Sequence, residues 1–197
     1  MAKKKTTNTN LLNSTIMKTK SQLKDVFNGP SSLLYQKAVL SGNTLTLEPE
    51  YDLPVKVDTI EFEQGEPNIE HYKVIGLAGD WVSSSEPGDI SLGFRVPSKD
   101  TDVLKLAYGE DAVKAATVTY GSDTFTGNGV VLKNKKITGT WAILNDTGDQ
   151  LLLLNNTALY ASTVLDSDAK GVVAIDFNGT IESDGTNPDI LFLKKAS

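Results

Sequence analysis

Residues 59 to 106 read TIEFEQGEPNIEHYKVIGLAGDWVSSSEPGDISLGFRVPSKDTDVLKL and decide the fold class. Toward the end of this stretch, residues 90 to 96 alternate between apolar side chains and small or polar ones, which is the two-residue period of a β-strand with one buried face. Acidic segments and a Pro87-Gly88 turn signal precede that strand. The stretch therefore predicts β-structure with one short helix after it, and it holds no constellation of residues for chemistry.

The same two-residue period recurs along the chain, most clearly where Val173, Ile175 and Phe177 alternate with smaller or polar residues. Further candidate strands cover residues 44–48, 55–63, 69–77, 116–120, 130–133, 137–145, 151–154, 159–165 and 190–194. Many short strands at close spacing are typical of a sandwich or a barrel. We predict a mainly β fold, an antiparallel β-sandwich or barrel with one short α-helix and an extended N-terminal arm.

The helix is predicted to begin after Pro97, with Ser98 as its N-cap and Gly109 as its end. Acidic residues in its first turn suit the helix dipole. Four apolar residues at helical spacing would share the face that packs on the sheet: Val103, Leu104, Ala107 and Tyr108.

We predict two regions: a flexible basic N-terminal arm over residues 1–31 and one β-sandwich domain over residues 32–197. The turn signal Asn28-Gly29-Pro30 ends the arm. Residues 1–24 hold six lysines and no acidic residue, which leaves 13 basic against 25 acidic residues, a net charge of −12, for the remainder. The arm is therefore either a solvated tail or a segment that orders against an acidic neighbouring subunit.

Composition excludes several classes of protein. The chain has no cysteine, which removes disulfides, thiol nucleophiles and Cys-based zinc sites. No apolar run approaches the roughly 20 residues that span a bilayer, and the N-terminus lacks a signal-peptide core, so we expect synthesis and folding in a bacterial cytoplasm. Arg95 is the only arginine, which argues against tight nucleic-acid binding by the acidic body.

We predict no catalytic, cofactor-binding or metal-binding residues. His71 is the only histidine and has no nucleophile-elbow sequence to partner it, so we interpret it as an exposed strand residue. Glu61 and Glu63 lie on one strand face and could belong to a glycosidase, but sugar-stacking aromatic residues are scarce. A solvated acidic face, a channel lining or a ring contact are the other interpretations of this pair.

Two loop-like segments and one tryptophan suggest chemistry or binding at first sight but fit structural roles better. DSDAKG, residues 166–171, imitates the start of a calcium loop but fails at its fifth and twelfth positions, so we predict a hairpin turn. GSDTFTGNG, residues 121–129, lacks the P-loop lysine and is predicted to be a flexible loop. Trp81 is predicted to be a core residue, with a subunit contact as its alternative.

The order of strands and helix from Thr59 to Leu106, with GTIESDGTNPDILFLKK near the C-terminus, resembles phage major tail proteins and the related inner-tube proteins of contractile injection systems. The resemblance covers roughly residues 33–195. It implies a virion protein of the tail tube whose copies form stacked rings, commonly hexameric in this family, around a channel for DNA ejection. It also implies tape-measure and tail-completion proteins as partners, and DNA that passes without specific binding.

An acidic channel wall would suit this function, because DNA carries about one negative charge per 1.7 Å of its axis and would adhere to a basic wall. The candidate wall residues are Glu61 and Glu63, with Asp176 and Glu182 as weaker candidates. Two alternatives stay open: another phage structural protein, such as a head decoration or baseplate component, and a carbohydrate-binding or adhesin-like β-sandwich.

Overall fold

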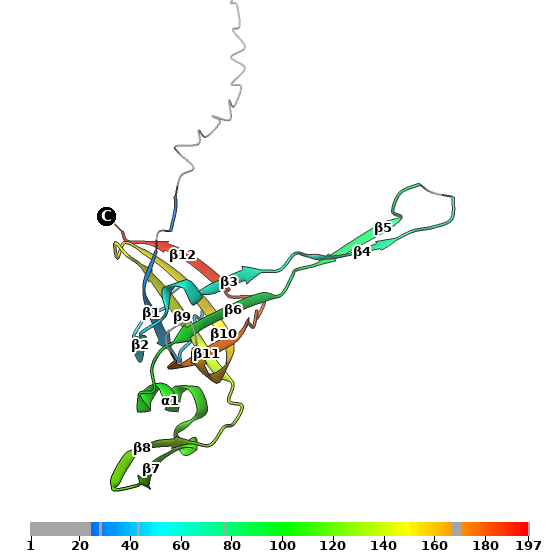
Figure 1. Ribbon diagram of the computed structural model, residues 1–197. Helices are drawn as coiled ribbons and strands as arrows, with labels where there is room; N and C mark the ends of the chain where they lie inside the picture. The colour runs from blue at the N-terminus through cyan, green and yellow to red at the C-terminus, as the bar shows by residue number, and fades with distance from the viewer. Residues whose placement is uncertain (1–24, 28, 43, 77, 167–170, 197) are drawn as a thin grey trace, which may run out of the picture.

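The computed structural model describes residues 25–27, 29–42, 44–76, 78–166 and 171–196. Within these ranges the protein is mainly β, with antiparallel sheets and a single α-helix (Figure 1). The largest sheet has eight strands: β1 (Pro30–Gln36), β2 (Tyr51–Leu53), β3 (Glu61–Gln64), β6 (Ile90–Val96), β9 (Ile137–Asn145), β10 (Gln150–Asp166), β11 (Val172–Ile181) and β12 (Ile190–Lys194).

The strand order in this sheet is β2-β1-β9-β10-β11-β6-β3, and β12 also pairs with β10. β10 is long enough to have two different neighbours on one edge. Its first part, from Gln150 to Leu154, pairs with β12, and its second part, from Thr157 to Asp166, pairs with β11. Between the two parts the register with β9 shifts and Asn156 has φ 48°, so the strand bulges and bends there.

The bend lets one sheet cover the core from two sides, which makes the fold sandwich-like. Asn155 satisfies the backbone at this point: its Oδ1 accepts from Leu40 N at 2.7 Å and its Nδ2 donates to the Pro188 carbonyl at 3.3 Å. The end strands β2 and β3 do not pair with each other in the described ranges, so the sheet stays open. The predicted mainly β sandwich is confirmed, and the closed barrel is not formed.

The core is built around the fully buried side chain of Trp141 on β9. Its ring centroid lies 4.7 Å from those of Tyr35 on β1 and Phe94 on β6, and 6.1 Å from that of Phe177 on β11. Offset and tilted aromatic contacts of this kind stabilise a core beyond the area they bury. Four strands that are distant in sequence are joined at this one point.

The helix α1 (Thr101–Tyr108) follows β6, as predicted, but begins later than expected. Asp100 rather than Ser98 is the N-cap, and its carboxylate accepts from Asp102 N. Ser98 Oγ instead accepts from Asp100 N in the preceding turn. Gly109, with φ 100°, ends the helix as predicted, and the predicted apolar face is buried.

Two β-hairpins project from this body (Figure 1). The first joins β4 (Asn68–Tyr72) to β5 (Val82–Glu86), and the second joins β7 (Val113–Tyr120) to β8 (Asp123–Val130). β8 corrects the prediction of a flexible loop at residues 121–129. A strand headed by Trp81 is expected from the sequence, but the bounds of β5 could not be predicted, because its three consecutive serines show no alternation with apolar residues.

Other details differ from the sequence prediction. Residues 44–48 form only an isolated bridge between Ser41 and Thr44, and residues 131–133 lie outside any strand. Short 3-10 helices cover Val57–Thr59, where a continuous strand was predicted, and Glu110–Ala112. The two predicted strands at 151–154 and 159–165 are one strand, β10.

Near the N-terminus, β1 begins at Pro30, so Pro30 and Ser31 belong to the sheet and not to the predicted arm. The predicted arm residues 1–24 lie outside the described ranges. Strand β10 ends at Asp166, which pairs with Val172 of β11. The predicted hairpin turn at residues 166–171 lies between these two strands, and its residues 167–170 are outside the described ranges. In the described part of the chain, no helix is both long and apolar enough to cross a membrane.

Candidate functional site

The predicted wall acids lie on the face of the sheet that points away from the core. On β3, Phe62 packs against the core while Glu61 and Glu63 on either side of it are exposed. They pair with Gly93 and Ser91 of β6, whose neighbours Leu92 and Phe94 are buried. Alternation thus places both glutamates on the outer face, which we call the polar face.

Asp176 of β11 lies on the same polar face but carries its own counter-ion. Arg95 on β6 donates to it twice, from Nε to Oδ1 at 2.6 Å and from Nη2 to Oδ2 at 2.9 Å. This two-point geometry is the strong form of an ion pair, and both side chains are largely buried. Asp176 therefore adds little net negative charge to the polar face.

A shallow pocket of about 290 Å³ brings Glu61, Arg95 and Asp176 together. The remaining lining residues come from the same strands and the segment before β3: Lys56, Asp58, Thr59, Gly93, Phe94 and Asn178. The pocket is lined by three acidic and two basic residues, and one of its three carboxylates, that of Asp176, is bound to Arg95.

Glu182, just beyond β11, is also ion-paired. Its Oε1 accepts from Lys136 Nζ at 2.5 Å, and this hydrogen bond raises the pKa of Lys136 above its usual value. Of the four predicted wall acids, Glu61 and Glu63 keep the more open carboxylates, while Asp176 and Glu182 are neutralised by cations. The sequence could not reveal these pairs, because Arg95 and Lys136 are 81 and 46 residues away from their partners.

The first hairpin is entirely open to solvent. Every described residue from Glu66 to Pro87 is exposed, although the segment contains Ile69, Tyr72, Ile75 and Trp81. Trp81 is 64% exposed, so its prediction as a core residue is wrong. Trp81 instead lies on the surface, because β5, the strand that follows it, pairs with β4 in the projecting hairpin and not with a strand of the largest sheet.

The register of this hairpin separates its side chains into two faces. Tyr72 pairs with Val82 and Glu70 pairs with Ser84, and Glu86 falls on the same side by alternation. We call this side the Tyr72 face. The opposite side carries Ile69, His71 and Trp81.

His71 is an exposed residue of β4, as predicted. Its Nδ1 lies 2.6 Å from Asp80 Oδ2, at the far end of the hairpin, and both groups remain partly open to solvent. Ser83 lies opposite His71 in the register of the hairpin, and the His71–Asp80 contact ties the two strands together near their connection.

The second hairpin is also exposed from Lys114 to Asn128. In its register Val118 pairs with Phe125, and Tyr120 with Asp123, which places three large apolar side chains on one side. We call this side the Phe125 face; Lys114 lies on it nearer the body. The other side carries threonines and Asn128, whose Nδ2 donates to Thr101 Oγ1 of α1, so the Phe125 face points away from the helix.

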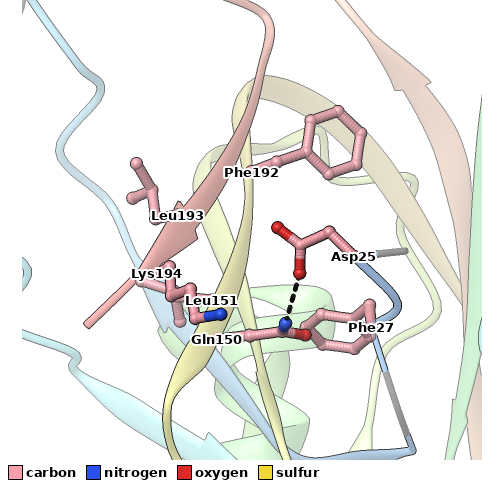
Figure 2. Close-up of a pocket in the computed structure, with 7 residues that line it drawn as sticks. All are labelled: Asp25, Phe27, Gln150, Leu151, Phe192, Leu193 and Lys194. Atoms are coloured by element: carbon pink, nitrogen blue, oxygen red, sulfur yellow. Dashed lines mark hydrogen bonds between the residues drawn. The ribbon is translucent and has the colours of Figure 1, made fainter. Parts of the chain in front are cut away.

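A third exposed region lies at β12, where a pocket of about 240 Å³ separates the sheet from the chain segment before β1 (Figure 2). Gln150 Nε2 donates to Asp25 Oδ1 at 3.1 Å and holds this segment against β10. Phe192 is 79% exposed, and Phe27 and Leu193 are partly so. The pocket is small, and its lining is mostly apolar: Asp25, Phe27, Gln150, Leu151, Phe192, Leu193 and Lys194.

Within the described ranges, no group of three or more His, Asp or Glu side chains is arranged to hold a metal ion. No protein-family model, curated protein or solved structure matches this chain significantly. The chemistry of the surface is therefore the basis for a functional proposal: two solvent-exposed hairpins with apolar faces, and one polar sheet face.

Proposed function

We propose that this protein is a structural subunit that assembles with copies of itself, and specifically a tail tube subunit of the phage major tail protein type. The observation that carries the proposal is the pair of projecting hairpins: the first is exposed over both strands, the second from Lys114 to Asn128, and both include large apolar side chains. A protein that acts as a monomer does not need exposed apolar hairpins of this kind.

The physical argument begins with the stability of a hairpin. A two-stranded hairpin is marginally stable in water by itself and needs a third strand, a helix or another surface to cover one face. Tyr72, Trp81, Tyr120 and Phe125 are all more than half exposed. Exposed apolar surface of this kind, flanked by polar residues, marks a contact with another molecule.

The tube form of the proposal rests on the open sheet and on the resemblance in strand order. The strands β2 and β3 end the largest sheet and each has one unpaired edge in the described part of the chain. Edges of this kind pair with other chains unless they are protected. Repeated head-to-tail contact that closes produces a ring, and stacked rings produce a tube.

In this proposal the polar face lines the channel. Glu61 and Glu63 supply negative charge that repels passing DNA, whereas Asp176 and Glu182 act mainly through their ion pairs with Arg95 and Lys136. Tape-measure and tail-completion proteins are the proposed further partners. DNA passes through the channel without a specific contact, and the virion tail is the proposed location.

The carbohydrate-binding alternative deserves a test against the geometry. Tyr72 and Trp81 are exposed, which meets one requirement for sugar stacking. They lie on opposite faces of the hairpin, however, so they do not form one aromatic platform. The hairpins therefore fit a protein contact better than a sugar.

The experiment compares the full chain with a variant that lacks the first hairpin. Gly65 N donates to the Asp89 carbonyl at 2.8 Å, so the two strands meet at the hairpin base and residues 67–87 can be removed by joining Glu66 to Gly88. No described residue in the removed segment is buried, so the variant should unfold at the same temperature as the full chain.

Negative-stain microscopy and sedimentation velocity then measure assembly. The full chain is expected to form rings or hollow tubes as its concentration rises, and the folded variant is expected to remain monomeric. A full chain that stays monomeric at high concentration contradicts the proposal. Discs or closed shells without a channel would instead support a different phage structural protein.

A further inference from the structure

Strand β12 has an open edge that neither the hairpins nor the polar face involves. It pairs with β10 along one edge, and in the described part of the chain no strand pairs with its other edge, which we call the free edge of β12. Near the end of the strand Phe192 is 79% exposed and Leu193 is 42% exposed. An open strand edge with apolar side chains pairs with another extended segment unless it is protected.

The backbone of β12 presents hydrogen-bonding groups at this edge. Lys195 N, just beyond the strand, donates to the Asp149 carbonyl at 2.8 Å. In an antiparallel pair this pattern repeats every second residue, so the amide of Leu193 also faces β10. The amides and carbonyls of Phe192 and Lys194 then point to the free edge, where an added strand can pair with them.

Both faces of β12 are apolar at the free edge. Phe192 pairs with Leu152, which packs against the core, so Phe192 lies on the core side of the sheet. Leu193 pairs with Leu151 and lies on the opposite side (Figure 2). Neighbouring residues of a strand point to opposite faces, so a strand covers both sides of this edge only if it has two consecutive apolar residues.

The sequence before Asp25 contains a segment with this pattern. Residues 11–17 read LLNSTIM and hold two pairs of consecutive apolar residues, Leu11-Leu12 and Ile16-Met17. The rest of the first 24 residues is dominated by lysine, threonine, asparagine and serine. Residues 11–17 are therefore the part of this region that gains most from a contact with β12.

The described chain begins beside the free edge. Asp25 and Phe27 line the same pocket of about 240 Å³ as Phe192 and Leu193, and Gln150 holds Asp25 there (Figure 2). Residues 18–24 join residues 11–17 to this point and can span about 25 Å when extended, which is enough to reach β12. A short tether of this kind gives the attached segment an effective concentration in the millimolar range, which favours it over a segment from another molecule.

We propose that residues 11–17 add to the free edge of β12 of the same chain as a further β-strand, with their apolar pairs beside Phe192 and Leu193. The backbone groups at the edge supply the hydrogen bonds, and the apolar side chains supply the buried area. The added strand protects β12 from pairing with other chains. This inference goes beyond the proposed function and does not depend on it, because docking within one chain needs no second copy.

Cross-linking in the full-length chain tests the docking, because the natural chain contains no cysteine. Ser14→Cys places a thiol between the two apolar pairs, and Lys194→Cys places one at the end of β12. Lys194 is exposed, so its substitution leaves the core unchanged. The double variant is treated at low protein concentration with a short bismaleimide, and the intramolecular product is measured by gel mobility and mass spectrometry.

The double variant Ser14→Cys with Glu63→Cys is the matched control. Glu63 is exposed on β3, which also has an unpaired edge in the described part of the chain. We expect the variant with Lys194→Cys to cross-link at least about tenfold faster, because docking raises the effective concentration of its two thiols. Adding Leu12→Asp and Ile16→Asp should remove this difference, because a carboxylate is costly to bury in an apolar contact.

Amide hydrogen exchange, followed by NMR, tests whether the contact is a strand addition. The amides of Phe192 and Lys194 should exchange at least about tenfold more slowly in the natural full-length chain than in the chain with Leu12→Asp and Ile16→Asp. The amide of Leu193, which faces β10, should exchange slowly in both chains and shows that β12 keeps its place in the sheet.

Each outcome supports or overturns the docking. Equal cross-linking of the two double variants overturns it, and so does equal exchange of the Phe192 and Lys194 amides in the natural and aspartate-substituted chains. A mixture of the single variants Ser14→Cys and Lys194→Cys that forms cross-linked dimers as fast as the double variant closes on itself assigns the edge to a neighbouring copy and also overturns it. A chain that stays monomeric but forms the intramolecular cross-link contradicts self-assembly and supports the docking.

Discussion

Replacement of Tyr72 by Ala is expected to weaken assembly without changing the stability of the subunit. Tyr72 is the last residue of β4 on the Tyr72 face and is 73% exposed, so its side chain contributes little to the folded monomer. Surface substitutions away from caps, pairs and the core usually change the free energy of unfolding by no more than about 0.5 kcal/mol. Any large effect must then come from the contact with another copy.

The magnitude follows from the area that Tyr72 leaves for a partner. A tyrosine buries about 200 Å² when fully covered, so the exposed 73% corresponds to about 150 Å². At about 25 cal/mol per Å², complete coverage is worth about 4 kcal/mol and half coverage about 2 kcal/mol. Tyr72→Ala should therefore raise the dissociation constant of assembly by about 30- to 700-fold.

Sedimentation velocity over a concentration series measures that constant, and thermal unfolding of dilute monomer measures stability. Tyr160→Ala is the matched control, because Tyr160 is also exposed but lies on the polar face, opposite Asn178. In our proposal the polar face lines the channel and makes no contact with another subunit. Equal assembly of Tyr72→Ala and the natural chain would refute the reasoning. So would equal weakening by Tyr160→Ala.

Three other predictions concern the core, the pH dependence and the channel. Trp141→Ala should lower the free energy of unfolding by about 3 to 5 kcal/mol, because it leaves a cavity at the centre of the core. Trp81→Ala should change it by less than about 0.5 kcal/mol, because Trp81 is exposed. Chemical denaturation measures both values, and similar values for the two variants would contradict the fold. Burial, with smaller effects from nearby acidic groups, raises the pKa of Tyr35 to about 12, so the neutral phenol contributes its stability fully below pH 10 and loses it as pH rises to 12. The loss should be about 2 to 3 kcal/mol and should be missing in Tyr35→Phe, and identical pH profiles of the two proteins would argue against a buried phenol. Replacement of Glu61 and Glu63 by Lys should leave assembly nearly intact and slow DNA passage, as measured by ejection from particles that carry the variant; normal ejection would remove both residues from the channel wall.

The sequence predicted the bounds of three strands of the largest sheet, β6, β9 and β12. In β6 the buried Leu92 and Phe94 share one face, and the less buried Ser91 and Arg95 share the other. The projecting hairpins were predicted poorly. β5 and β8 bury neither face, so no alternation between apolar and polar side chains marks them.

The candidate site shows the same limit. That Glu61 and Glu63 share one face follows from their spacing of two residues, and the structure agrees. That Asp176 is neutralised by Arg95 does not follow from any local pattern, because the pair forms only when β11 lies beside β6. Trp81 was misplaced for a related reason: the sequence shows a large apolar side chain but not the distance of its strand from the core.

The amino-acid sequence by itself determined the β class of the fold, the single helix with its buried face, and the acidic body that follows a basic N-terminal stretch. These properties depend on composition and on short-range periodicity, which any segment carries with it. Only the tertiary structure decided which apolar residues are buried in the core and which are left on two projecting hairpins, and which acidic residues meet a cation. The reason is physical: burial and ion pairing depend on contacts between strands that lie far apart in the chain, and such contacts exist only once the sheet has formed.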